Sequence, residues 1–246
     1  MRKILYILIS GLLAVSCQQE YLPEQALGEC VLELNLSRAN KPDASTRAVD
    51  DDLAVSIFTG GILYKYYPAG EVPSKIVLDI LEGEKKTFVI QAYTENQDSW
   101  QNANSGKGEG CYFAEQTIEM EYDEFKHLDM SVPMTNYAVS LELPPLFDVL
   151  FPHYTFSLTS GNRNISILQK EKAYFDIRDG GFSYALQATN MDGATHSHSP
   201  IQFTDVESGK LFLLKYNYDS DATSGGIEIE ITLDMNTEET DKEIEP

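Results

Sequence analysis

From residue 28 onwards, hydrophobic and polar positions alternate with a two-residue period, the pattern of half-buried β-strands. In the first such segment, Cys30, Leu32, Leu34 and Leu36 alternate with mostly polar neighbours. The same period recurs over residues 53–57, 88–92, 128–132, 137–143, 154–158, 182–188, 211–218 and 227–233. No stretch keeps a helical period, and the proline-flanked residues 146–151 could form at most one or two turns. The sequence therefore predicts an all-β fold of antiparallel strands.

A short internal similarity favours two tandem domains. Residues 88–92 resemble residues 184–188, and a long polar loop follows each segment. Roughly 220 residues lie outside the two ends, which suffices for two domains of about 100 residues each. We therefore expect two Greek-key β-sandwiches, an N-terminal one over residues 28–133 and a C-terminal one over residues 134–236.

The first 17 residues have the layout of a lipoprotein signal. Two basic residues precede a short apolar run, and the small Ser16 precedes Cys17. The run is too short to cross a bilayer as a permanent helix. We therefore predict a signal peptide over residues 1–16, cleavage after Ser16, palmitate-type lipid on Cys17, and a lipid-anchored linker over residues 17–27.

The chain is strongly acidic. It has 39 acidic and 18 basic residues and a net charge of −21, and loss of two basic residues with the signal would make the secreted form −23. Nucleic acid and anionic lipid headgroups both need a basic face, so neither is an expected partner. The acidity favours solubility outside the cell, and it continues in residues 237–246, a tail with too few apolar residues to order itself.

The cysteines leave two states open. If Cys17 carries lipid, Cys30 and Cys111 remain and could pair in an oxidising compartment. Cys30 lies in an alternating segment, and Cys111 follows a glycine-rich loop. We favour buried or loosely placed thiols over a disulfide bond.

Candidate catalytic chemistry is sparse. The sequence has no nucleophile elbow, zinc helix, phosphate loop or dinucleotide fingerprint, so we expect neither an enzyme nor a cofactor. His196 and His198 could share a metal, but no third ligand is near, and solvated loop histidines are the simpler interpretation. Residues 219–230 have the spacing of a calcium loop, yet Ser224 replaces the required glycine, which favours a hairpin turn. We expect no metal site.

Aromatic residues are candidates for ligand binding. Trp100 lies in a polar loop, and Tyr66 lies in the tyrosine-rich segment 64–67. Exposed rings can stack on sugars, so Trp100 and Tyr66 are candidate glycan-stacking residues. The alternative is that the tyrosines are ordinary strand residues and that Trp100 caps the edge of a core.

Three features together resemble a known family. They are the lipid-site Cys17, the short strand over residues 29–34, and the sequence Ser-Thr-Arg-Ala over residues 45–48. In this order they resemble the fimbrillin-like lipoproteins of Gram-negative gut anaerobes, and more narrowly a two-domain lipoprotein family of unknown function from the same bacteria. The resemblance implies transthyretin-like sandwiches, export to the outer membrane, display on the cell surface, and partners among membrane lipid and fimbrial subunits.

The resemblance also implies a mode of assembly. Polymerising fimbrillins are cut after an arginine and lose their first strand, and the opened groove accepts a strand from another subunit. Arg47 is the matching candidate for cleavage, and residues 30–36 would be the released strand. Because the tail after residue 236 does not alternate, we predict a fimbrial anchor or accessory adhesion subunit that accepts a strand. The alternative is a surface lipoprotein outside any pilus that binds host or dietary glycans.

Overall fold

The computed structural model describes residues 27–39, 52–95, 97–197, 199–218 and 227–234, and most of them lie in sixteen β-strands. The helical segments among these residues are short: η1 (Trp100–Asn102), α1 (Ala103–Gly106), α2 (Phe147–Leu150) and η2 (Ile177–Asp179). The predicted all-β fold is confirmed. No helix in these ranges has the length and apolarity to cross a bilayer.

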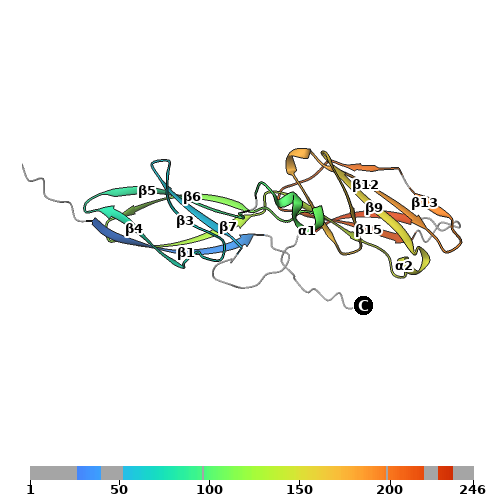
Figure 1. Cartoon of the computed structure of the whole chain (residues 1–246), viewed down its shortest axis with the longest axis horizontal. Coiled ribbons are helices and arrows are strands. Elements are labelled where there is room, and N and C mark those ends of the chain that lie inside the picture. The colour runs from blue at the N-terminus through green and yellow to red at the C-terminus, as the bar shows by residue number, and fades with distance from the viewer. Residues whose placement is uncertain (1–26, 40–51, 96, 198, 219–226, 235–246) are drawn as a thin grey trace, which may run out of the picture.

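Seven strands form a first sandwich, shown at the left of Figure 1. They are β1 (Leu27–Ala39), β2 (Ala54–Thr59), β3 (Ile62–Tyr67), β4 (Lys75–Leu81), β5 (Lys85–Tyr93), β6 (Phe113–Glu121) and β7 (Phe125–Pro133). One sheet has the order β4-β1-β7 and the other has the order β3-β2-β5-β6. Alternate side chains of both sheets point inward and form one largely aliphatic core.

Nine strands form a second sandwich, shown at the right of Figure 1. They are β8 (Tyr137–Glu142), β9 (His153–Ser160), β10 (Arg163–Ile167), β11 (Lys172–Phe175), β12 (Phe182–Thr189), β13 (Thr195–Ser197), β14 (Ile201–Phe203), β15 (Leu211–Tyr218) and β16 (Ile227–Asp234). One sheet has the order β11-β8-β15-β16, and the other has the order β10-β9-β12-β13, with β14 also paired to β12. Its separate core is rich in phenylalanine and tyrosine.

The two sandwiches repeat one topology. In the first, β1 is antiparallel to β4 and parallel to β7. In the second, β8 is antiparallel to β11 and parallel to β15. The similar segments 88–92 and 184–188 lie in β5 and β12, which pair with β2 and β9 in the same way. The second sandwich has two more strands. Strands β13 and β14 both pair with β12, where β6 alone pairs with that side of β5. Strand β16 pairs with the outer side of β15, where no described strand pairs with the outer side of β7.

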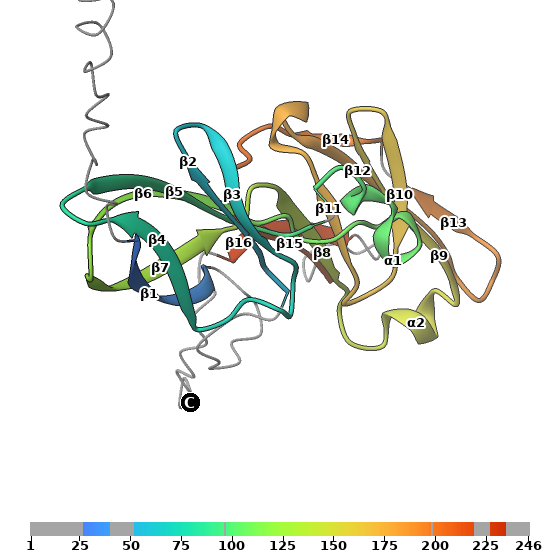
Figure 2. The same ribbon diagram turned by 60° about the vertical axis from the view of Figure 1, so that its left-hand side comes forward.

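A joint connects the two sandwiches, which lie end to end (Figures 1 and 2). The joint is made by η1 and α1 on one side and Arg163 and Phe175 on the other. The Arg163 guanidinium lies 5.3 Å from the ring centres of both Trp100 and Phe175. It also donates to the carbonyl oxygens of Gln101 at 3.3 Å, Gly106 at 2.7 Å, and Tyr174. One charged side chain therefore binds backbone from both sandwiches.

Candidate functional site

Strand β1 fills the middle of its sheet. Residues 27–33 pair with β4, and residues 31–39 pair with β7. Three inward leucines, Leu32, Leu34 and Leu36, are at most 1% exposed. Because β1 pairs on both sides, its removal would leave unpaired N–H and C=O groups along both β4 and β7. These two rows would face each other across an apolar surface.

Side-chain contacts fasten β1 near its C-terminal end and at its middle. Near its end, Arg38 forms an ion pair with Asp52, the first described residue after the 40–51 segment, and lies 5.0 Å from the ring centre of Tyr112. Further back, His127 of β7 contacts Glu33 of β1 at 3.1 Å and Asp129 at 3.1 Å. The hydrogen bond to Glu33 and the charge of Asp129 raise the pKa of His127 above its ordinary value. These contacts join β1 to residues that follow the 40–51 segment in the chain.

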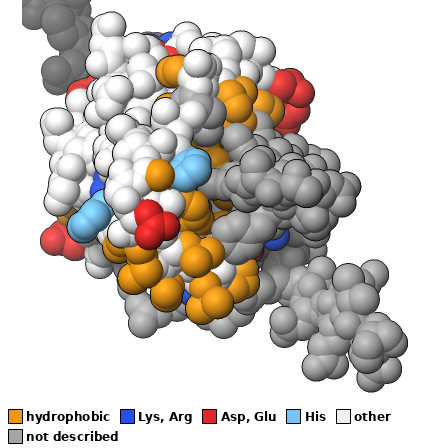
Figure 3. All heavy atoms as spheres, turned by 90° about the vertical axis from the view of Figure 1, so that its right-hand side faces the viewer, with side chains coloured by type: hydrophobic (Ala, Val, Ile, Leu, Met, Phe, Trp, Pro, Cys, Tyr) orange, Lys and Arg blue, Asp and Glu red, His pale blue; other side chains and the backbone are white. Residues whose placement is uncertain are grey.

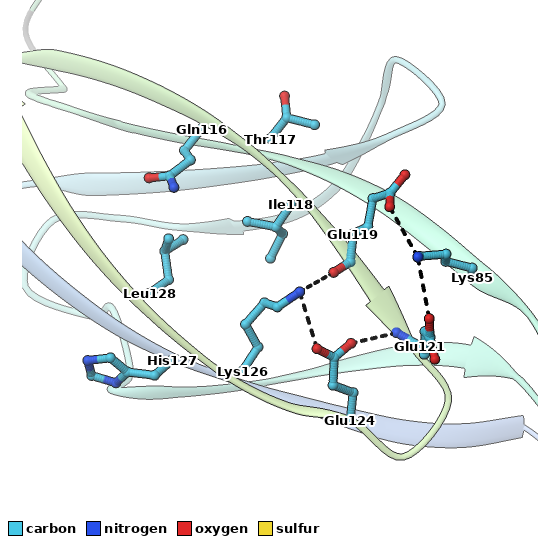
Figure 4. Close-up of a pocket in the computed structure, with 10 residues that line it drawn as sticks. All are labelled: Lys85, Gln116, Thr117, Ile118, Glu119, Glu121, Glu124, Lys126, His127 and Leu128. Carbon is cyan, nitrogen blue, oxygen red and sulfur yellow. Dashed lines mark hydrogen bonds and ion pairs between the residues drawn. The ribbon is translucent and has the colours of Figure 1, made fainter.

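A groove lies between β6 and β7, the adjacent edge strands of the two sheets, and we call it the β6–β7 groove (Figure 4). Its volume is about 640 Å³. Apolar Ile118 and Leu128 contribute to its lining. The polar side chains around them are Lys85, Gln116, Thr117, Glu119, Glu121, Glu124, Lys126 and His127. Sequence analysis missed this groove, although the alternation Thr117, Ile118, Glu119, Met120, Glu121 carries the signal of an edge strand.

Ion pairs order the polar rim of the β6–β7 groove. Lys85 lies 3.3 Å from a carboxylate oxygen of Glu119 and 3.4 Å from one of Glu121, and these carboxylates raise the pKa of Lys85. Lys126 pairs with Glu124 at 3.2 Å and donates to the backbone oxygen of Glu119. The backbone N–H of Glu121 donates to Glu124 at 2.8 Å and lowers the pKa of that carboxyl. Three carboxylates thus face two lysines.

The candidate glycan-stacking residues do not line this groove, and they differ in exposure. Trp100 is 7% exposed, because Arg163 covers its ring and Gly108 packs against it. A Cβ at Gly108 would lie 3.1 Å from the Trp100 ring, so the close packing needs glycine. Tyr66 is 48% exposed, and its hydroxyl donates to Glu95, which raises the pKa of Tyr66 to about 12. Trp100 is therefore a buried residue of the joint, whereas the Tyr66 side chain is accessible.

Several other residues from the sequence analysis can be placed. Cys30 and Cys111 are buried free thiols, and burial raises the pKa of both. His196 lies beside the Phe151 ring, 5.7 Å between centres. No group of three metal-ligating side chains occurs in the part of the chain that the structure describes. Ser16, Cys17, Arg47, His198 and residues 219–226 of the calcium-like segment lie outside the described residues.

The far end of the second sandwich carries exposed apolar side chains (Figure 3). They come from α2 and its flanks and from the turn after β12: Leu146, Val149, Leu150 and Met191, exposed by 72%, 57%, 48% and 76%. Leu146 has a left-handed backbone conformation with φ of 63°, which is costly for a residue with a Cβ. The predicted short turn at this point is present as the four-residue α2.

The fold defines a tandem β-sandwich protein in which no described strand pairs with the outer side of β7 in the first sandwich. The chain belongs to the family described as domain of unknown function (DUF4493), whose model matches residues 28–245. This membership confirms the predicted resemblance to a family of unknown function. No curated protein shows a significant sequence match.

Several solved structures are similar to this chain. A fimbrial assembly protein from Parabacteroides distasonis has 11% identity and a TM-score of 0.49, with 85% of this chain and 99% of that chain covered. The tip fimbrial protein Mfa3 from Porphyromonas gingivalis has 8% identity and a TM-score of 0.42, with coverage of 85% and 99%. The fimbrial anchor protein Mfa2 from the same organism has 11% identity and a TM-score of 0.37, with coverage of 85% and 98%.

Proposed function

We propose that this protein is a fimbrial anchor or accessory adhesion subunit on the cell surface, held in the outer membrane by lipid on Cys17 and joined to its partner by β-strand addition. Its role is structural, and no catalytic step is assigned to it. The observation that carries the proposal is the placement of β1. The segment that follows the lipid site leads directly into a strand paired on both edges.

The position of β1 suits an anchor for a mechanical reason. Tension between the lipid and a partner would pull β1 along its length, because β1 is the first described element after Cys17. The hydrogen bonds of both ladders would then share the load, together with three leucines in the core. A strand at the rim of the sheet would offer only one ladder. The architecture therefore favours a retained β1 over a discarded one.

Cleavage at Arg47 has a defined place in this proposal. Arg47 lies in the polar segment 40–51, where a cut would separate β1 from β2 in sequence. The Arg38–Asp52 ion pair and the two β1 ladders would still hold the pieces together. We expect a cut chain to keep its first strand until a competing strand displaces it.

The test is the intact mass and N-terminal sequence of the protein extracted from native outer membranes. An acylated Cys17 on a chain that continues through Arg47 supports the anchor. A chain that begins at Ala48 with no acylated fragment attached would contradict it and would indicate a subunit that exchanges its first strand. Protease treatment of intact cells tests surface display, since a surface anchor is digested and a protein facing the periplasm is protected.

A further inference from the structure

We propose that a partner's β-strand adds to the outer edge of β7 and fills the β6–β7 groove while β1 stays in place. The inference rests on the proposed function, because it names the site at which the anchor accepts a strand. The expected occupant is an extended segment of another protein, antiparallel to β7. Its apolar residues face the groove, and its outward residues are lysine, arginine or neutral.

The second sandwich shows how such an edge is completed. Strand β15 lies beside β8 as β7 lies beside β1, in parallel register. On its other side, β15 pairs antiparallel with β16 over residues 211–218. In the first sandwich no described strand occupies the corresponding place. The repeat therefore specifies both the position and the direction of a missing strand.

The backbone of β7 presents hydrogen-bonding groups toward that place. The Val31 N–H donates to the Glu124 carbonyl at 2.9 Å. This bond shows which residues of β7 direct their backbone groups toward β1 and which direct them away. By alternation, even-numbered residues of β7 bond to β1, and Phe125, His127, Asp129 and Ser131 point their N–H and C=O groups outward. Within the described ranges, no hydrogen bond is made to these outward N–H and C=O groups; the bonds of His127 and Asp129 are made by their side chains. Unpaired edge groups of this kind accept an added strand.

The opposite edge of the same sheet is protected. There, the Asp79 N–H of β4 donates to the Tyr64 hydroxyl at 3.0 Å, and the Val77 carbonyl accepts from Lys65. Side chains of β3 thus occupy the positions that an added strand would need. Among the described residues, the β4 edge is capped and the β7 edge is open, which favours β7 as the acceptor.

The groove supplies an apolar surface for the incoming side chains. Ile118 and Leu128 are 8% and 7% exposed, and Met130 is 3% exposed, whereas the leucines of β1 are at most 1% exposed. These residues form the accessible margin of an otherwise closed core. Apolar residues at every second position of an added strand would complete their burial.

Charge selects the kind of partner. Glu119, Glu121 and Glu124 outnumber the two lysines of the groove, and Asp129 lies on the outer face of β7. A second copy is a poor donor, because its β16 sequence alternates isoleucine with glutamate and would bring like charges together. A strand with basic or neutral outward residues avoids that repulsion.

The test uses the secreted chain without its lipid-site cysteine, residues 18–246, and a nine-residue fluorescent peptide that alternates valine with lysine. We expect saturable binding, and about tenfold weaker binding of the valine–glutamate peptide, a difference of about 1.4 kcal/mol. Amide exchange locates the site, since the N–H groups of His127, Asp129 and Ser131 should gain protection. Those of Leu128 and Met130, already bonded to β1, should not change.

Two variants form a matched pair. Ser131→Pro removes an outward N–H of β7, and Val77→Pro does the same on the capped β4 edge; proline is tolerated at such edge positions. Only Ser131→Pro should abolish binding, with thermal melts as the folding control. Glu119→Lys changes an exposed rim residue. It should weaken binding of the valine–lysine peptide about threefold and strengthen binding of the valine–glutamate peptide.

The outcomes separate this inference from the proposed function. Binding only to a chain that lacks residues 1–47 would overturn the β7 site and leave strand addition at the β1 position. Binding to neither chain would overturn both. Equal binding of the glutamate peptide, or dimerisation of the chain through this edge, would overturn the assignment to a basic partner strand.

Discussion

The two sandwiches place different side chains at the start of the same topology. In the first, β1 presents only leucines and Cys30 to the core. In the second, β8 begins with Tyr137, whose hydroxyl donates to the Gly181 carbonyl at 3.0 Å and lies 3.1 Å from Ser160 Oγ. The Tyr137 ring lies 5.8 to 6.1 Å from the rings of Phe175, Phe182 and Phe212. The second sandwich fixes the buried face of its first strand by specific hydrogen bonds and ring contacts, whereas the polar contacts of β1 through Glu33 and Arg38 lie outside its row of buried leucines.

The edges differ in the same sense. The sheet of β8 is completed by β16, whereas the sheet of β1 ends at β7. In the second sandwich the outer side of β15 is therefore paired, whereas in the first the outer side of β7 has no described partner strand and could accept an added one. The joint around Arg163 connects the two parts, so a load on one reaches the other.

The largest expected effects come from leucine truncation in the first strand of each sandwich. Leu36 of β1 and Leu141 of β8 are both 1% exposed, so each change to alanine should cost about 3 kcal/mol of unfolding free energy. The two variants should differ in how much of the sandwich unfolds. Leu36→Ala should let β1 open locally, whereas Leu141→Ala should weaken the second sandwich as a whole.

Urea unfolding and amide exchange measure these two quantities. In Leu36→Ala, the β1 amides should exchange before those of β5 in the same sandwich. In Leu141→Ala, the β8 amides should exchange together with those of β12. Simultaneous exchange of β1 and β5 would contradict the expected local opening of β1 and would show that Leu36→Ala weakens the first sandwich as a whole.

A smaller effect is expected at the joint. Arg163→Ala removes the backbone hydrogen bonds to both sandwiches and the contacts with Trp100 and Phe175, and should cost about 2 kcal/mol. The sandwiches should then move independently, which small-angle scattering would record as a broader distribution of lengths. Arg178→Ala is the control, because that side chain is 86% exposed and pairs only locally, with Asp176. Unchanged scattering of Arg163→Ala would show that the joint does not depend on this side chain.

The hydroxyl of Tyr137 should contribute less again. Tyr137→Phe keeps the ring and removes the bond to Gly181, so we expect a loss of about 1 kcal/mol. Tyr66→Phe removes an exposed hydroxyl and should cost under about 0.5 kcal/mol. Calorimetry with a separate transition for each sandwich would assign each loss. An equal loss in both variants would show that the Tyr137 hydroxyl does not anchor β8.

Local periodicity was enough to predict the class of fold and several core strands. The alternation of β1 and the similarity of β5 to β12 were visible because burial on one face imposes a two-residue period. The turn at α2 was visible because prolines enclose it. Edge strands such as β4 and β10 were not predicted, although β4 alternates clearly over Lys75–Leu81.

The features that define the site depend on distant pairs. Leu34 pairs with Leu128 in parallel, and no local pattern specifies a partner so far along the chain. The same limit applies to Trp100. Its polar loop indicated an exposed ring, but Arg163 of the other sandwich covers that ring, and no local pattern specifies this contact. The open edge of β7 is a property of the strand order, and the sequence reveals it only when the two repeats are aligned in space.

The smallest expected effect is a pH dependence of the β1–β7 contact. Glu33 and Asp129 raise the pKa of His127 above 6.5, so the contribution of His127 is complete below about pH 6.5 and is lost as the pH rises through the raised value. The pKa of Asp129 is lowered, chiefly by a hydrogen bond from Asn35, so its titration falls below this window. The difference in melting temperature between the native chain and His127→Gln should therefore be positive near pH 5.5 and shrink toward zero by about pH 8.5. A difference that grows with pH would mean that neutral His127 holds β1 more firmly, and would remove the charge-based link between the first strand and the open edge.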